Sequence, residues 1–171
     1  MKKIIIALAL IVYSSVFVYG QNSAVDQLFA KYADKDGFTT VSISKGMFNL
    51  FARDDEPKDE FNKAIKGLES IRILTPDETL PKGSLNFYKE ICKTLPVTQY
   101  EELLSVKEKD QVFKMLIRRK AGIISEFLMI GGGKDNVLIS ITGNIDLRSI
   151  SKLSKAMNID GMENIDKVEK H

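Results

Sequence analysis

The tract Gly131-Gly132-Gly133-Lys134 is the segment of this sequence that most suggests chemistry, because a glycine-rich loop followed by lysine can hold phosphate. A Walker-type loop also needs a glycine five positions before the last one and a Ser or Thr after the lysine. This chain has Leu128 and Asp135 at those positions. The segment that follows reads as a strand, whereas phosphate binding requires the start of a helix. We therefore interpret the tract as a hairpin turn that uses glycine for positive φ angles.

The tract Asp34-Lys35-Asp36-Gly37 resembles part of a calcium-binding loop. Aligning Gly37 with the glycine of such a loop puts Tyr32 at the first ligand position and Ile43 at the last. Neither side chain offers a carboxylate, so the sequence predicts no calcium site here.

A second group of acids lies between residues 53 and 60 and precedes a segment with helical spacing, which begins near Pro57. Carboxylates at the positive end of a helix have a structural explanation. Three Asn-Ile-Asp triplets, at 144–146, 158–160 and 164–166, are explained by helix caps and turns. We expect no metal site and no cofactor.

A nucleophilic catalyst is difficult to build from this chain. The one cysteine, Cys92, lies on an expected helix and is predicted to be buried, and the one histidine, His171, is the last residue. No Ser occupies a Gly-x-Ser-x-Gly elbow. The sequence therefore singles out no catalytic residue and leaves enzymatic activity uncertain, with a non-catalytic role favoured.

Arg118, Arg119 and Lys120 form the one basic run. On a strand they are expected to alternate between the two faces and to form no single patch. A solvated strand end is the simpler interpretation, and a surface for an acidic ligand or partner is the alternative.

The first twenty residues have the pattern of a secretory signal peptide. Lys2 and Lys3 precede an uncharged run, and Val18 and Gly20 supply small residues before a cleavage point between Gly20 and Gln21. A membrane anchor is the alternative, but the run contains serines and is short for a span. Because no cysteine follows the cleavage point, lipidation is not expected. We predict an exported chain, periplasmic or secreted, with no stable membrane anchor after cleavage and one domain over residues 21–171.

The charge of the chain changes when this leader is removed. The whole sequence has 25 Lys and Arg against 23 Asp and Glu, and the leader holds two of the lysines. The remaining chain is balanced, so no basic footprint predicts binding to nucleic acid.

The first half of the chain alternates helices and strands. Val25, Leu28, Phe29 and Tyr32 share one helical stripe that Asn22 or Ser23 can cap, and 38–44 and 70–74 read as strands. Helical segments separate these two strands, which favours parallel pairing through a crossover. A further helix is expected after Ser84, as far as Pro96.

The second half has a period of two with short connections, which predicts a four-stranded antiparallel meander between 100 and 143. The apolar residues expected to share a face are, strand by strand, Tyr100 with Leu104 and Val106; Phe113, Met115 and Ile117; Ile124, Leu128 and Ile130; and Val137, Ile139 and Ile141. A last helix is expected from Asp146. The predicted class is α+β, with helices packed on one sheet face.

Two tracts carry a resemblance to a known family. They are Val41-Ser42-Ile43-Ser44-Lys45-Gly46-Met47 and the long tract from Phe127 to Leu147, with its three glycines and Thr142-Gly143-Asn144. The sequence resembles the domain-of-unknown-function 4252 family, a group of exported proteins of the Bacteroidota. This resemblance implies an envelope location and supplies no active-site residues. Some relatives resemble lipoproteins, and the absence of a lipobox cysteine departs from them.

Two hypotheses of function follow. The first is a non-catalytic envelope module that binds a partner protein or ligand through its sheet face or an edge strand. The second is an envelope hydrolase that uses carboxylates or lysines, which a deep pocket with convergent ionisable groups would favour. The sequence specifies neither the ligand nor the oligomeric state.

Overall fold

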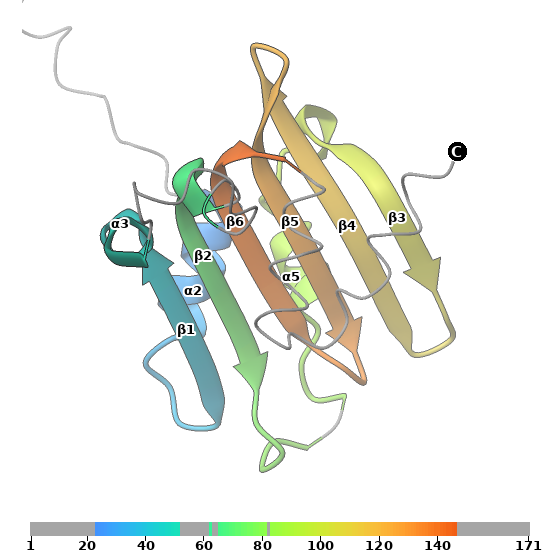
Figure 1. The fold of residues 1–171 in the computed structure, drawn as a ribbon. Helices are drawn as coiled ribbons and strands as arrows, with labels where there is room; N and C mark the ends of the chain where they lie inside the picture. Colours follow the sequence, from blue (N-terminus) through green and yellow to red (C-terminus); the bar gives the residue numbers. More distant parts are fainter. Residues whose placement is uncertain (1–22, 52–61, 63–64, 82, 147–171) are drawn as a thin grey trace, which may run out of the picture.

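The computed structural model describes residues 23–51, 62, 65–81 and 83–146. One antiparallel sheet of six strands dominates it, in the order β1-β2-β6-β5-β4-β3 (Figure 1). The strands are β1 (Phe38–Ser44), β2 (Leu68–Pro76), β3 (Glu101–Lys107), β4 (Gln111–Lys120), β5 (Ile123–Gly133) and β6 (Val137–Ile145). The described helices are α2 (Ala24–Tyr32), α3 (Lys45–Phe51) and α5 (Phe87–Ile91), with a 3-10 turn at Val97–Gln99. The fold is therefore mixed α and β, and mostly sheet.

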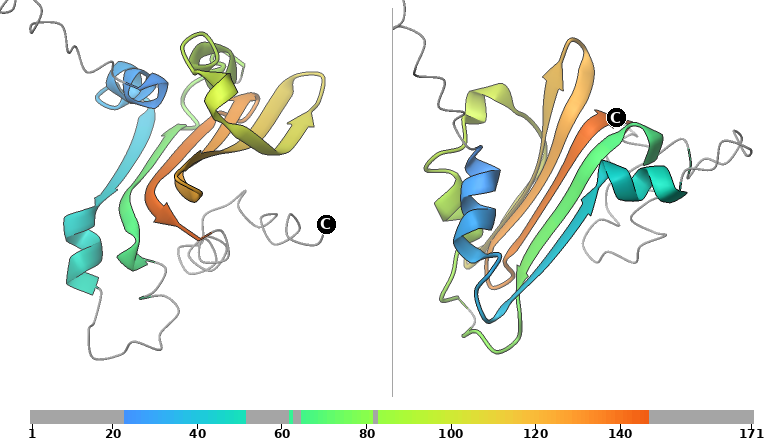
Figure 2. Two further views of the ribbon diagram at one scale, coloured as in Figure 1. Left: turned by 90° about the horizontal axis from the view of Figure 1, so that it is seen from above. Right: turned by 90° about the vertical axis from the view of Figure 1, so that its left-hand side faces the viewer.

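Helices α2 and α5 cover one face of the sheet (Figure 2). The start of α2 is fixed by Ser23, whose hydroxyl accepts a hydrogen bond from the backbone N–H of Asp26 while the Asp26 carboxylate accepts one from the backbone of Ser23. The predicted stripe of α2 is buried against side chains of the sheet and of α5. This cluster includes Val25, Leu28, Phe29, Tyr32, Leu74, Phe87, Ile91, Leu116, Leu128, Ile130 and Leu138.

The opposite face of the sheet carries a second apolar cluster. Its central side chains are fully buried, and α3 and the segment before β2 contribute Phe48 and Ile65 to it. Helix α3 therefore lies on the other side of the sheet from α2 and α5, which differs from the expectation that the helices share one face (Figure 2). The sheet residues of this cluster include Ile71, Met115, Ile117, Phe127, Met129, Ile139 and Ile141.

The predicted parallel pairing of the first two strands is wrong. β1 and β2 pair antiparallel, with Phe38 opposite Pro76 and Ser44 opposite Ser70. The physical reason is that α3 lies at the end of β1, close to the start of β2, and does not lead the chain back along the sheet (Figure 1). A parallel pair requires a crossover that returns the chain to the opposite end.

The strands of the second half are neighbours in chain order, but they belong to a larger sheet because β6 also pairs with β2. In two places, apolar residues that were predicted to share a face of one strand lie on opposite faces. In β3 the register shifts between Glu102 and Leu104, so Tyr100 packs in the cluster beneath the helices and Leu104 packs in the opposite one. Strand β5 is buried on both faces, and Ile124 packs in a different cluster from Leu128.

Helix α5 is shorter than predicted. Asn86 caps it through a hydrogen bond from the Lys89 N–H to its side-chain oxygen, and Cys92 ends it. Several expectations fall outside the described residues, namely the signal peptide with Gly20 and Gln21, the acids between 53 and 60, the helix after Asp146 and His171. Within the described part of the chain, no helix has the length and hydropathy needed to cross a membrane.

Candidate partner-binding edge

Strand β1 forms one edge of the sheet and is unusually simple in composition. Its sequence, Phe-Thr-Thr-Val-Ser-Ile-Ser, contains no charge, no proline and no glycine. It pairs with β2 at all seven positions without a register shift. No strand among the described residues pairs with its outer side. The outer side of β1 therefore offers a regular row of backbone donors and acceptors.

The other edge strand, β3, is protected in the way that natural edges usually are. It carries Glu101, Glu102 and Lys107, and it is bulged at Leu103. Arg119 and Lys114 of β4 pair with its two glutamates. Charges and a bulge disfavour the addition of another strand at β3, and β1 has neither.

Apolar side chains are exposed beside the β1 edge. Val41 in the middle of β1 is 39% exposed, and Met47 and Leu50 of α3 are also exposed. Helix α3 begins directly after β1 and lies at its end (Figure 1). A strand placed along β1 would therefore meet apolar side chains as well as backbone groups.

Local contacts hold β1 in place. Gly37, which precedes the strand, has a φ of +85°, and its carbonyl accepts a hydrogen bond from the Asp77 N–H at 2.9 Å. The ring of Phe38 lies 4.7 Å from that of Tyr32 and 6.3 Å from that of Phe87, measured between centroids. The tract 34–37 is thus the turn between α2 and β1. The described residues contain no group of three or more side chains suited to a metal ion.

Two sets of polar contacts hold α2, the helix beneath β1 and β2. Lys31 and Tyr32 both donate to the Glu90 carboxylate, at 2.6 Å and 2.7 Å, and so connect α2 to α5. Burial opposes ionisation of Glu90, but these hydrogen bonds prevail and lower its pKa. Arg72 of β2 pairs with Asp26 at 2.8 Å and lies over the Phe29 ring. These contacts connect α2 both to α5 and to β2, the strand that pairs with the edge.

The sheet face opposite α2 and α5 is a poorer candidate for docking. Met115, Phe127, Met129 and Ile139 on that face are fully buried. The face is apolar and already packed.

The glycine-rich tract belongs to strand β5, and the turn is formed by Lys134, Asp135 and Asn136. Of the three glycines, Gly133 alone has a positive φ, +119°. A Cβ on Gly132 would lie 2.4 Å from the Asn86 side-chain oxygen, so this glycine permits the close approach of α5 to the sheet. The tract therefore lies at the β5–β6 hairpin with a positive φ at Gly133, as predicted, but its other two glycines are strand residues.

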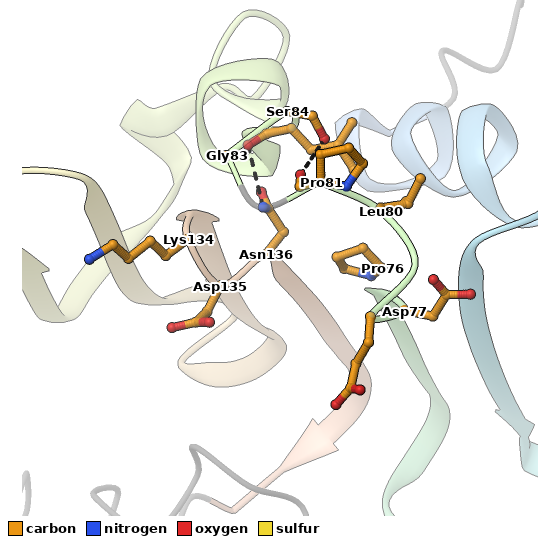
Figure 3. Close-up of a pocket in the computed structure, with 11 residues that line it drawn as sticks. Pro76, Asp77, Leu80, Pro81, Gly83, Ser84, Lys134, Asp135 and Asn136 are labelled. Atoms are coloured by element: carbon orange, nitrogen blue, oxygen red, sulfur yellow. Dashed lines mark hydrogen bonds between the residues drawn. The ribbon is translucent and has the colours of Figure 1, made fainter.

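Asn136 is the buried link in this region. Its side-chain oxygen accepts from the Phe87 N–H at 2.9 Å, and its amide donates to the carbonyls of Gly133 and Leu85. A pocket of about 270 Å³ lies beside it, between this turn and the loop after β2. Four charged side chains line the pocket, namely Asp77, Glu78, Lys134 and Asp135, and the three that are labelled extend in different directions (Figure 3). This arrangement does not supply the convergent ionisable groups of a hydrolase.

The remaining sequence-predicted residues are also placed. Cys92 is half-buried rather than buried, because α5 ends there, and it packs against the cluster around Phe87. Arg118, Arg119 and Lys120 border one pocket at the end of β4. Arg118 lies over the Tyr100 ring of the cluster beneath the helices, whereas Arg119 pairs with Glu101, which stands opposite Ile117 of the other cluster, so the two arginines follow the predicted alternation. The uncharged edge of β1 was not recognised in the sequence, since an edge strand is identified only when the strand order is known.

The fold and its edge define a class, a single antiparallel sheet with two helices on one face and one open, uncharged edge strand. Within that class, a family model described as "Domain of unknown function (DUF4252)" matches residues 32–153, and the chain belongs to this family. No curated protein and no solved structure matches it.

Proposed function

We propose that this chain is an exported, non-catalytic interaction module that binds an extended segment of a partner protein along strand β1. The observation that carries the proposal is the contrast between the two edges. β1 is regular and uncharged, whereas β3 is charged and bulged. Addition of a strand to a sheet edge is a common mode of peptide recognition.

The chemistry of β1 indicates what the partner segment contains. Main-chain hydrogen bonds supply affinity, and the side chains beside the strand supply specificity. Next to Val41 and Ile43 we expect β-branched or apolar residues, because such cross-strand pairs stabilise a sheet. Next to Thr40 and Ser42 we expect small polar residues. A charged side chain in the segment would find no partner on β1.

The test is selection from a library of displayed random peptides on the full chain, followed by binding measurements on two matched variants. Val41→Lys places a charge on β1, and Val106→Lys places the same charge on β3. The two valines are 39% and 42% exposed, and their cross-strand neighbours, Ile73 and Phe113, pack against the same cluster. The pair therefore differs chiefly in which edge is blocked.

We expect selected peptides to be uncharged and β-branched, and to bind Val41→Lys at least about tenfold more weakly than the wild type. Val106→Lys should bind as the wild type does. Equal binding by both variants, or selection of charged or helical sequences, would contradict the proposal. Self-association that Val41→Lys alone abolishes would make the partner strand a second copy of this chain.

A further inference from the structure

The backbone of an edge strand presents hydrogen-bonding groups to its open side at every second residue only. In an antiparallel pair each residue directs both its N–H and its C=O to the same neighbouring strand, and this direction alternates along the chain. The residues of β1 whose backbone groups point outward therefore determine how a partner segment docks on this strand.

One hydrogen bond fixes the alternation in β1. The Asp77 N–H donates to the Gly37 carbonyl at 2.9 Å. Because Phe38 stands opposite Pro76, Gly37 and Asp77 are the next two residues in register and form a hydrogen-bonded pair. The backbone carbonyl of Gly37 thus points towards β2. The alternation can be counted from this residue, since the pairing of β1 with β2 has no register shift.

The alternation divides the strand into inward-bonded and outward-pointing residues. Thr39, Val41 and Ile43 direct their N–H and C=O groups to β2. Thr40 and Ser42 direct theirs to the open side, where no strand among the described residues pairs with them. In the middle of β1, two donors and two acceptors are therefore available to a partner, and they belong to residues with small polar side chains.

The side chains of β1 alternate between the two faces of the sheet with the same period. Ile43 packs in the cluster on the face opposite α2, and Val41 points to that face as well. The Thr40 hydroxyl donates to the carbonyl of Ala33, at the end of α2, so Thr40 and Ser42 face the α2 side. Exposed apolar contact and outward backbone groups thus come from alternate residues of the strand.

On the basis of the proposed function, we infer that the partner segment runs antiparallel to β1 and places an apolar residue opposite Val41. All five strand pairs of the described sheet are antiparallel, and sheets with one type of pairing are over-represented. The pair at Val41 lacks hydrogen bonds to the segment, so its Cα atoms lie only about 4.5 Å apart and its side chains are in close contact.

This arrangement specifies which N–H groups the segment needs. The residues opposite Thr40 and Ser42 donate to β1, whereas the apolar residue between them directs its backbone away from β1. Proline lacks the donor, so it is compatible with the apolar position and excluded from the two flanking positions. In a parallel segment the requirement is reversed, because the residues with apolar side chains would then direct their N–H groups to β1.

The first test is an N-methyl scan of a selected peptide that binds the full wild-type chain and binds Val41→Lys more weakly. Each N-methyl group removes one N–H and keeps the side chain, so neighbouring positions of one peptide are matched controls. We expect methylation of either residue flanking the central apolar one to weaken binding at least about tenfold. Methylation of the apolar residue itself should change the affinity by less than about threefold.

The second test is amide hydrogen exchange of the full chain, followed by NMR. In the free chain the Val41 amide should exchange at least about tenfold more slowly than the amides of Thr40 and Ser42, because it is bonded to β2. Addition of the peptide should slow exchange at Thr40 and Ser42 more than at Val41.

Two results would overturn the inference. One is tolerance of methylation at the flanking residues with loss of binding at the apolar one, which indicates a parallel segment. The other is equal protection of the Thr40, Val41 and Ser42 amides in the free chain. Either result leaves the proposed function intact as long as Val41→Lys weakens binding. If no selected peptide binds Val41→Lys more weakly than the wild type, the proposed function fails, and the inference fails with it.

Discussion

Gly132 shows how a single residue sets the distance between a helix and the sheet. A Cβ at this position would lie 2.7 Å from the Cβ of Tyr88 and 2.8 Å from its backbone nitrogen, in addition to its contact with Asn86. Backbone atoms of α5 cannot move aside without displacing the helix. Gly132 thus has a role in helix packing that the sequence, read alone, did not reveal.

We predict that Gly132→Ala lowers the free energy of unfolding by about 2 kcal/mol, because overpacking forces a backbone shift. Gly46→Ala is the control, since its Cβ would meet nothing closer than the Ser44 hydroxyl oxygen at 3.6 Å. In α3 that control should be neutral or stabilising by about 0.5–1 kcal/mol. Denaturant melts of the two variants measure both values, and equal stabilities would refute the packing role.

Tyr100 gives a second prediction at this scale. Burial, together with the neighbouring Glu126 carboxylate, raises the pKa of Tyr100 far above its ordinary value. The folded chain therefore keeps this proton after the unfolded chain has lost it. The resulting stability is present below about pH 10, the ordinary tyrosine value, and is lost as the pH rises above it.

Tyr100→Phe should lower the free energy of unfolding at neutral pH by about 1–3 kcal/mol, because the buried Glu126 loses a hydrogen bond. It should also show a shallower loss of stability above about pH 10 than the wild type. Thermal melts across this range measure both effects. If stability falls equally steeply above about pH 10 in Tyr100→Phe and in the wild type, the raised pKa of Tyr100 is contradicted.

At the scale of elements, α2 and α5 are joined by Lys31, Tyr32 and Glu90. The folded pKa values of Glu90 and of Asp26 in α2 are both lowered, in each case by hydrogen bonds that outweigh burial. A lowered carboxyl pKa contributes stability above the unfolded value, and this stability is lost as the pH falls through the folded value.

We predict that stability falls below about pH 4, the ordinary carboxyl range. Glu90→Gln should lower the free energy of unfolding by about 1 kcal/mol at neutral pH. It should also reduce the loss of stability that occurs as the pH falls below about 4. Glu108→Gln, at an exposed residue after β3, should leave both unchanged. If Glu90→Gln and the wild type lose stability identically at acid pH, the contact between α2 and α5 does not contribute to the pH dependence of stability.

The elements themselves were largely predictable from the sequence. The segment 38–44 was predicted as a strand and is β1, and the stripe of Val25, Leu28 and Phe29 is buried as its spacing indicated. Periodicity reports local structure, which depends on neighbouring residues. The bulges at Leu103 and Ser125 were not predictable, because a bulge depends on how two strands pair.

At the scale of the whole molecule, the strand order of the sheet determines which strand forms an edge, and the sequence alone does not predict that order. The antiparallel pairing of β1 with β2 depends on the path of the chain between them, and the open edge exists only once β1 is placed outermost. The candidate site is therefore a property of topology. Its residues, Thr39 to Ile43, carry no chemical signature of their own.

Export also belongs to this scale. If the chain is processed as its first twenty residues indicate, mass spectrometry of the protein from its own cells should find Gln21 at the N-terminus. Cyclisation of Gln21 is compatible with this result. An intact Met1 in a membrane fraction would contradict export with cleavage and would require a different location for the partner.

The central claim is that β1 binds a partner protein, and site-specific photo-crosslinking in the producing cells tests it most directly. A photoreactive side chain replaces Val41 in one form of the full chain and Val106 in the other, and the adducts are identified by mass spectrometry. We predict one discrete adduct with another protein from position 41 and none from position 106. No adduct from position 41, or the same adducts from both positions, would contradict the claim.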